Sequence, residues 1–170
     1  MHHLHKWIKQ YSHLVKTNNG NIFNPDFQDF LLALNKEEVN YVLVGGYAVI
    51  YHGFPRTTGD LEIFVEVSKN NYDKLIQAFD HFQMPVFDMT EDSFLNQPNI
   101  NVYTFGRPPV CIEILKEISG FTFQEINQNA IVTVFEEIPM KVIHLNDLRR
   151  NKKISGRAKD INDLENLSEL

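Results

Sequence analysis

The stretch that decides the fold runs from Tyr41 to Val65 and reads YVLVGGYAVIYHGFPRTTGDLEIFV. It opens with a short, continuous apolar run, which is typical of a strand buried on both faces. Gly45-Gly46 ends that run, and Tyr47 to His52 is compact enough for a short helix. A second strand is expected over Leu61 to Val67. The stretch therefore predicts a strand, a glycine turn, a short helix and a second strand.

Two acidic residues stand at the start of the second strand. Asp60 and Glu62 are two positions apart, so a strand places both on one face, roughly 6.5 Å apart. Carboxylates this close are costly unless a positive charge lies between them. A divalent cation is the simplest such charge, and magnesium commonly uses one or two carboxylates together with substrate phosphates. The alternative interpretation is a strand edge with solvated acids.

A third acid lies in a later apolar strand, Val110 to Leu115. Glu113 shares its strand face with uncharged residues, so a position beside the first two acids would explain its charge. Three acids on two adjacent strands could hold two metal ions about 3.5–4 Å apart, which activates an attacking oxygen and stabilises leaving pyrophosphate. The alternative interpretation is a structural ion pair between Glu113 and Arg107 or Arg56.

The glycine turn and the connection that follows it carry candidate phosphate contacts. A strand, Gly45-Gly46 and then a helix allows close backbone approach, and the free N–H groups of the helix start attract an anion. Arg56 could contact phosphate oxygens bidentately, or it could pair with Asp60 as a structural ion pair. Thr58 is a candidate nucleotide contact, although the pair Thr57-Thr58 is also typical of a turn.

Basic residues gather near the end of the sequence. Six of the 16 lysines and arginines fall between Arg149 and Lys159. The default interpretation is a solvated charge run between two helices. The alternative is that Lys152, Arg157 or Lys159 folds back over a triphosphate. Asp160 could instead cap the last helix and hold Arg157 by an ion pair.

The bulk properties limit the class of protein. The 170 residues fit one domain, and 43% hydrophobic with 22% charged residues is ordinary globular composition. No apolar run approaches the roughly 18 to 20 residues of a membrane span, and the first residues do not form a signal peptide. The single cysteine, Cys111, suits a reducing cytosol, and the net charge of -6 argues against non-specific coating of nucleic acid. His2, His3 and His5 are interpreted as a terminal stretch rather than a metal cluster.

Hydrophobic periodicity predicts the remaining elements. The first 40 residues are expected to be helical, as an extension before a single α+β domain with a mixed sheet. No internal repeat or linker is evident. Helices are expected over 4–15, 25–34, 70–82, 147–153 and 160–167, and further strands over 100–105, 110–115, 131–135 and 141–143.

The motifs together resemble a known group. The segments VGGYAV (44–49), GFPRTTGDLE (53–62), IEIL (112–115), ISG (118–120), DLRRNK (147–152) and RAKD (157–160) carry the similarity. They resemble the minimal nucleotidyltransferases of the DNA polymerase β superfamily, and most closely its AbiEii-like bacterial members, sometimes labelled DUF6036. The resemblance spans about residues 40 to 167 and leaves the N-terminal segment uncovered. It implies a nucleotidyltransferase fold, a mixed sheet with helices packed mainly on one side.

The resemblance also implies roles for the candidate residues. Gly45 and Gly46 would touch the nucleotide phosphates, and Asp60 and Glu62 would bind magnesium. Glu113 would complete the metal site and accept the proton of the acceptor hydroxyl. The sequence departs from the family pattern in having glutamate at 62 and 113, where aspartate is usual. Each glutamate keeps the charge but extends the carboxylate by one methylene, and magnesium demands near-ideal octahedral geometry.

The leading hypothesis is a cytoplasmic, Mg²⁺-dependent nucleotidyltransferase. It would move a nucleoside monophosphate from a nucleoside triphosphate to a hydroxyl or phosphate of a small molecule, a tRNA or a protein. The second hypothesis is a catalytically weak or inactive relative that binds nucleotide or a partner protein, such as a toxin–antitoxin component. The third is a plain structural domain with solvated acids.

Overall fold

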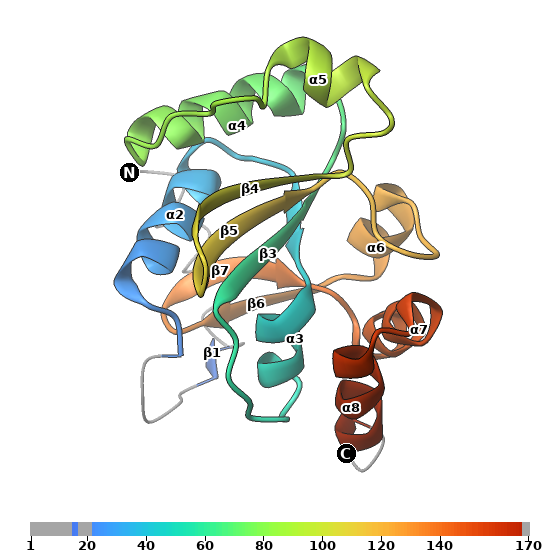
Figure 1. Cartoon of the computed structure of the whole chain (residues 1–170). Coiled ribbons are helices and arrows are strands. Elements are labelled where there is room, and N and C mark those ends of the chain that lie inside the picture. The colour runs from blue at the N-terminus through green and yellow to red at the C-terminus, as the bar shows by residue number, and fades with distance from the viewer. Residues whose placement is uncertain (1–14, 17–21, 168–170) are drawn as a thin grey trace. The chain divides into compact units, whose positions relative to one another are not determined.

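The computed structural model describes residues 15–16 and 22–167, and Figure 1 shows their helices and strands. These residues form two compact units. One unit contains the described residues of 1–40 together with 66–100 and 132–141. The other contains 41–65, 101–131 and the described residues from 142 onward, so every candidate site residue lies in this second unit. In the described part of the chain, no helix is both long and apolar enough to span a bilayer.

The described residues of the first unit form three helices and the strands beside them. A cluster of aromatic rings packs α2 against α4, with Phe30 in edge-to-face contact with Phe79 and Phe82 at centroid distances of 5.3 and 5.2 Å. Asn24 caps α2 by accepting the N–H of Phe27, as its position before Pro25 predicts. The elements of this unit are β1 (Val15–Lys16), α2 (Pro25–Lys36), α4 (Lys69–His81), α5 (Glu91–Asn96), most of β6 (Ile131–Phe135) and most of β7 (Ile138–Val142).

The second unit carries the central strands. Its strands are hydrogen-bonded in the order β7-β2-β3-β5-β4, with the last residue of β7 opposite Leu43 of β2. β3 is antiparallel to β2 and parallel to β5, so the sheet is mixed as predicted. The elements of this unit are β2 (Tyr41–Leu43), α3 (Gly45–Tyr51), β3 (Asp60–Val65), β4 (Val102–Arg107), β5 (Val110–Leu115), α6 (Phe123–Asn129), α7 (Leu145–Ser155) and α8 (Ala158–Leu167).

The structure differs from the predicted elements in several places, of which four bear on the fold. The helix expected over 4–15 lies outside the described residues except for Val15, which belongs to β1. Two short helices, α5 and α6, were not expected, although Thr90 and Thr122 cap them. The short helix α3 begins at Gly45 rather than Tyr47. β7 begins before Pro139, whose missing N–H is tolerated near a strand start.

Candidate functional site

The register of two strands brings the three predicted acids together. β3 runs parallel to β5, with Glu62 directly opposite Glu113 and Asp60 opposite Cys111. Because alternate residues of a strand share a face, Asp60, Glu62 and Glu113 lie on one face of this pair. Leu61 and Ile63 are fully buried on the other face. The structure therefore places the acids as the sequence expects, on two adjacent strands.

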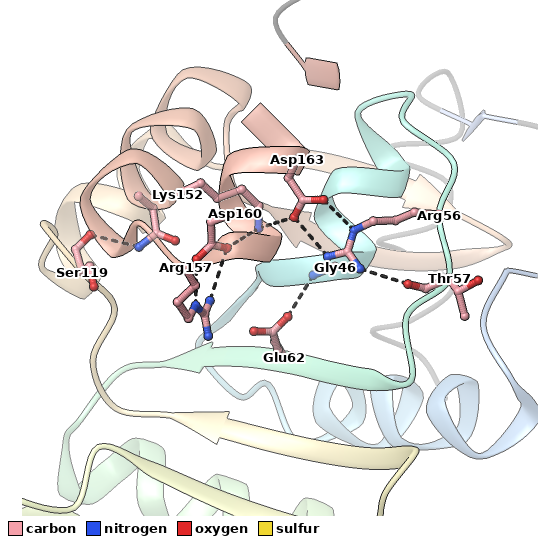
Figure 2. A network of polar contacts seen from close by, with 10 residues as sticks. Gly46, Arg56, Thr57, Glu62, Ser119, Lys152, Arg157, Asp160 and Asp163 are labelled. Atoms are coloured by element: carbon pink, nitrogen blue, oxygen red, sulfur yellow. Dashed lines mark hydrogen bonds and ion pairs between the residues drawn. The ribbon is translucent and has the colours of Figure 1, made fainter. Parts of the chain in front are cut away.

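Glu62 makes a contact that the sequence does not reveal. Its Oε2 accepts a hydrogen bond from the backbone N–H of Gly46 at 2.9 Å, at the start of α3 (Figure 2). Gly45 has a φ of +64°, and a Cβ placed on it would lie only 1.6 Å from the same Oε2. The backbone conformation at 45 favours glycine, and any side chain there would displace the Glu62 carboxylate from its present position.

The second glycine is required by a different neighbour. A Cβ on Gly46 would lie 2.3 Å from Oγ1 of Thr58 and 3.1 Å from a guanidinium nitrogen of Arg56. The connection that leads into β3 thus packs directly on the start of α3. This arrangement places four of the six residues predicted to contact nucleotide, Gly45, Gly46, Arg56 and Thr58, at one short helix.

The environment of Glu113 makes its charged form less favourable than it is in water. Burial, and then the charges of Glu62 and Asp60, raise the pKa of Glu113 above its ordinary value, while Lys159 and Arg157 lower it by less. Burial, and then the charges of Asp60 and Glu113, raise the pKa of the Cys111 thiol. No ion pair joins Glu113 to Arg107 or Arg56 in the described part of the chain. The negative charge of the three acids is therefore incompletely offset by nearby cations.

Two buried aspartates of α8 hold a cation from α7. The side chain of Lys152 is 3% exposed, and its Nζ lies 3.0 Å from Oδ1 of Asp160 and 2.7 Å from Oδ2 of Asp163. Both aspartates are essentially inaccessible to solvent. Lys152 was predicted to contact nucleotide, but these two ion pairs use its ammonium group inside the protein (Figure 2).

Two arginines join the same aspartates. Arg56 pairs with Asp163 rather than with Asp60, through Nε at 2.8 Å and through Nη2 at 3.1 Å. Arg157 donates from Nε to Asp160 at 2.7 Å, so the expected ion pair between these two residues is present. We call the set of Arg56, Lys152, Arg157, Asp160 and Asp163 the α8 ion-pair network.

A pocket of about 390 Å³ opens beside the acids and the network. Of the predicted site residues, Gly45, Glu62, Glu113, Lys152 and Arg157 line it, whereas Asp60, Gly46, Arg56 and Thr58 are not part of its lining. Sequence reasoning missed the rest of the lining and also Asp163. The spacing of Asp160 and Asp163, one helical turn apart, was the available signal for a shared face. The other lining residues are Val44, Asn101, Val102, Leu115, Glu117, Ile118, Ser119, Asn151 and Ser155.

The α8 ion-pair network predicts how the stability of the protein depends on pH. Burial alone would raise the pKa of Asp160, but hydrogen bonds from Arg157 and Lys152 outweigh it and lower the pKa to about 2. Because the folded pKa is depressed below the ordinary 3.8, the stabilisation is present above pH 4 and is lost as the pH falls toward 2. We expect Asp160 to account for about 1 kcal/mol of the unfolding free energy lost between pH 5 and pH 3.

Urea unfolding at the two pH values measures this loss. In Asp160→Asn the difference in unfolding free energy between pH 5 and pH 3 should be smaller than in the wild type by about 1 kcal/mol. The exposed Glu165 lies on the same helix, and Glu165→Gln serves as a control for removal of one acid. An unchanged pH dependence in Asp160→Asn would show that the aspartate is not held by the network in solution.

Comparisons with known proteins support the fold. No protein-family model matches the chain, and no curated protein sequence matches it either. Its structure is similar to the crystal structure of an antigenic nucleotidyltransferase-like protein from Paracoccidioides brasiliensis. The match has a TM-score of 0.51 and 20% sequence identity, and it covers 84% of this chain and 74% of the fungal chain. The chain therefore has the mixed α+β nucleotidyltransferase fold.

Proposed function

We propose that the protein is a Mg²⁺-dependent nucleotidyltransferase. It transfers a nucleoside monophosphate from a nucleoside triphosphate to a hydroxyl or phosphate of an acceptor, and pyrophosphate leaves. The observation that carries the proposal is the register of β3 and β5, which sets Asp60, Glu62 and Glu113 on one face. Glu62 and Glu113 also line a pocket with Arg157. The motifs quoted above favour membership of the AbiEii-like group.

The chemistry of the three acids fits a hard divalent cation. Carboxylate oxygens are the ligands that magnesium prefers. The raised pKa of Glu113 reflects burial and then the negative charges of Glu62 and Asp60, which a cation would offset. Asp60, Glu62 and Glu113 would hold the ion. In the part of the chain that the structure describes, no three acidic, histidine or cysteine side chains converge into a complete metal-binding group. The carboxylate of Glu62 accepts a hydrogen bond from the backbone N–H of Gly46. Bound Mg²⁺ would supply positive charge to the phosphate oxygens.

The residues of the chain supply the other parts of the reaction. Glu113, half-buried and with a raised pKa, is the group that accepts the proton of the acceptor hydroxyl. Arg157 supplies positive charge for the phosphate chain from the pocket lining, and Arg56 adds positive charge from outside that lining. The N–H groups at Gly45 and Gly46 and the hydroxyl of Thr58 lie at the same helix start. Rate enhancement would come chiefly from positioning and from charge neutralisation.

A second candidate function is a binding protein that lacks turnover. The hydrogen bond from Gly46 to Glu62 favours it, because it holds one of the proposed metal ligands at a backbone donor. Such a protein would bind nucleotide or a partner chain, as a regulator or as one component of a toxin–antitoxin pair. The glutamates at 62 and 113, where aspartate is usual in the family pattern, motivate the same alternative.

Two measurements on the purified protein separate these functions. Calorimetry with each nucleoside triphosphate, with and without Mg²⁺, reports binding. Transfer of a labelled α-phosphate to small hydroxyl compounds, tRNA or protein, together with pyrophosphate release, reports turnover. Mg²⁺-dependent binding with turnover is expected. Binding without release of pyrophosphate across all acceptors would favour the second function. The absence of any nucleotide binding would contradict the transferase and would leave, of the second function, only the binding of a partner chain.

A further inference from the structure

Three cations from separate parts of the second unit converge on one face of α8. Arg56 comes from the connection before β3, Lys152 from α7, and Arg157 from the residue just before α8. All three are held by Asp160 and Asp163, which lie one helical turn apart and are buried (Figure 2). Three positive charges against two negative charges leave the network with one net positive charge.

The three cations are not equally able to reach a ligand. Lys152 is buried, and its ammonium group lies within 3.0 Å of both aspartates. The side chain of Arg56 is 20% exposed, is paired with Asp163 and is not part of the pocket lining. The side chain of Arg157 is 56% exposed and lines the pocket beside Glu62 and Glu113. Arg157 is therefore the cation of the network that combines solvent exposure with a place in the pocket.

The contact between Arg157 and Asp160 fixes the orientation of the guanidinium group. Nε donates to Oδ2 at 2.7 Å, and Nη2 approaches Oδ1 at 3.4 Å. A guanidinium has five N–H donors, so these contacts leave others for a ligand in the pocket. Lys152 holds Oδ1 of the same aspartate from a second direction. The long, half-exposed side chain of Arg157 is therefore restrained before any ligand binds. This restraint reduces the conformational entropy that the side chain loses on binding.

We propose that Arg157 is the pocket residue that contacts the phosphate chain of a nucleotide, and that Asp160 is a positioning residue that holds Arg157 in place for this contact. The inference deepens the proposed function, because it assigns one part of the substrate to one side chain and explains why that side chain is held. It does not require turnover. A phosphate chain without sugar or base is therefore the appropriate ligand for the test.

The test is calorimetric titration of the full chain with inorganic tripolyphosphate, with and without Mg²⁺. We expect Arg157→Ala to weaken binding by about 10- to 100-fold, the range for a charged hydrogen-bonding group. Asp160→Asn should weaken it by about tenfold. In the Arg157→Ala background, Asp160→Asn should change the dissociation constant by less than about twofold, since Asp160 acts through Arg157. Glu165→Gln, at an exposed position of the same helix, should bind like the wild type.

A purely structural role for Asp160 gives a different pattern. In that case Asp160→Asn would weaken binding equally in both backgrounds, and this result would overturn the proposal. So would an unchanged affinity in Arg157→Ala, or the absence of tripolyphosphate binding to the wild type. Arg157→Lys keeps the charge at an exposed position but cannot make the two-nitrogen contact with the aspartate. It should lose about fivefold in affinity, and wild-type affinity in this variant would contradict positioning even if Asp160→Asn failed to fold.

The same proteins separate this inference from the proposed function. Tripolyphosphate binding that depends on Arg157 and Asp160, with no pyrophosphate release from any nucleoside triphosphate, would leave the positioning role intact and remove the transferase. Turnover with unaltered tripolyphosphate binding in both variants would do the reverse.

Discussion

Replacing Asp60 by Asn is expected to lower nucleotide transfer by about 10³-fold, while the free energy of unfolding changes by less than about 0.5 kcal/mol. Asp60 is the first residue of β3 and is half-buried beside the two glutamates. Asparagine keeps its shape but removes the charge that would bind a cation. Turnover in the proposed reaction needs that charge, and no described contact of the Asp60 side chain holds the fold together.

The acids around Asp60 also determine whether Asp60→Asn slightly raises or lowers the free energy of unfolding. The charge of Asp60 contributes to the raised pKa of Glu113, so its removal relieves repulsion between like charges. Asp60→Asn should therefore unfold at the same urea concentration as the wild type, or a slightly higher one. This makes loss of transfer in the variant attributable to the site rather than to unfolding.

A matched control makes the experiment decisive. Asp80→Asn makes the same chemical change at an exposed position of α4 and should leave transfer unchanged. Transfer is measured as incorporation of a labelled α-phosphate, and unfolding by urea with far-UV circular dichroism. Wild-type transfer in Asp60→Asn would exclude this acid from catalysis and would remove the main support for the transferase.

The parts of the site that could be predicted depend on local patterns. Alternation of apolar and acidic residues is a short-range signal, and by itself it is enough to place Asp60 and Glu62 on one strand face. The same signal identifies the strand of Glu113. A glycine pair between a strand and a helix is likewise local. The two strands and the shared face of Asp60 and Glu62 therefore follow from the sequence, whereas the pairing of β3 with β5 does not follow from a local pattern.

The parts that could not be predicted depend on contacts between distant residues. The ion pair between Arg56 and Asp163 joins positions 107 residues apart, and no local pattern assigns the two to each other. The bond from Gly46 to Glu62 depends on where one side chain points, which periodicity does not determine. The short helix α6 was missed even though its Thr122 and Glu125 form a capping box, because a helix of seven residues has too few turns to show periodicity.

Replacing Lys152 by Met is expected to destabilise the protein by about 3 kcal/mol, which lowers the melting temperature by about 6–12 °C. Methionine fills a similar volume, so the loss comes from the charge rather than from a cavity. Of the cations in the described residues, Arg157 would then remain beside Asp160, and Arg56 beside Asp163. Two inaccessible carboxylates then share less positive charge, and an incompletely paired buried charge is the costly case.

A substitution at Lys153 and measurements at two pH values test whether the lost charge causes the destabilisation of Lys152→Met. Lys153 is exposed, so Lys153→Met removes the same charge from the same helix and should change stability by less than about 0.5 kcal/mol. The deficit of Lys152→Met should also narrow between pH 5 and pH 3. Lys152 helps to lower the pKa of Asp160, so the variant protonates Asp160 more readily, which removes a charge that lacks a partner. Equal effects of the two substitutions would place Lys152 on the surface. A deficit independent of pH would instead mean that packing of its methylene chain, and not its charge, joins α7 to α8.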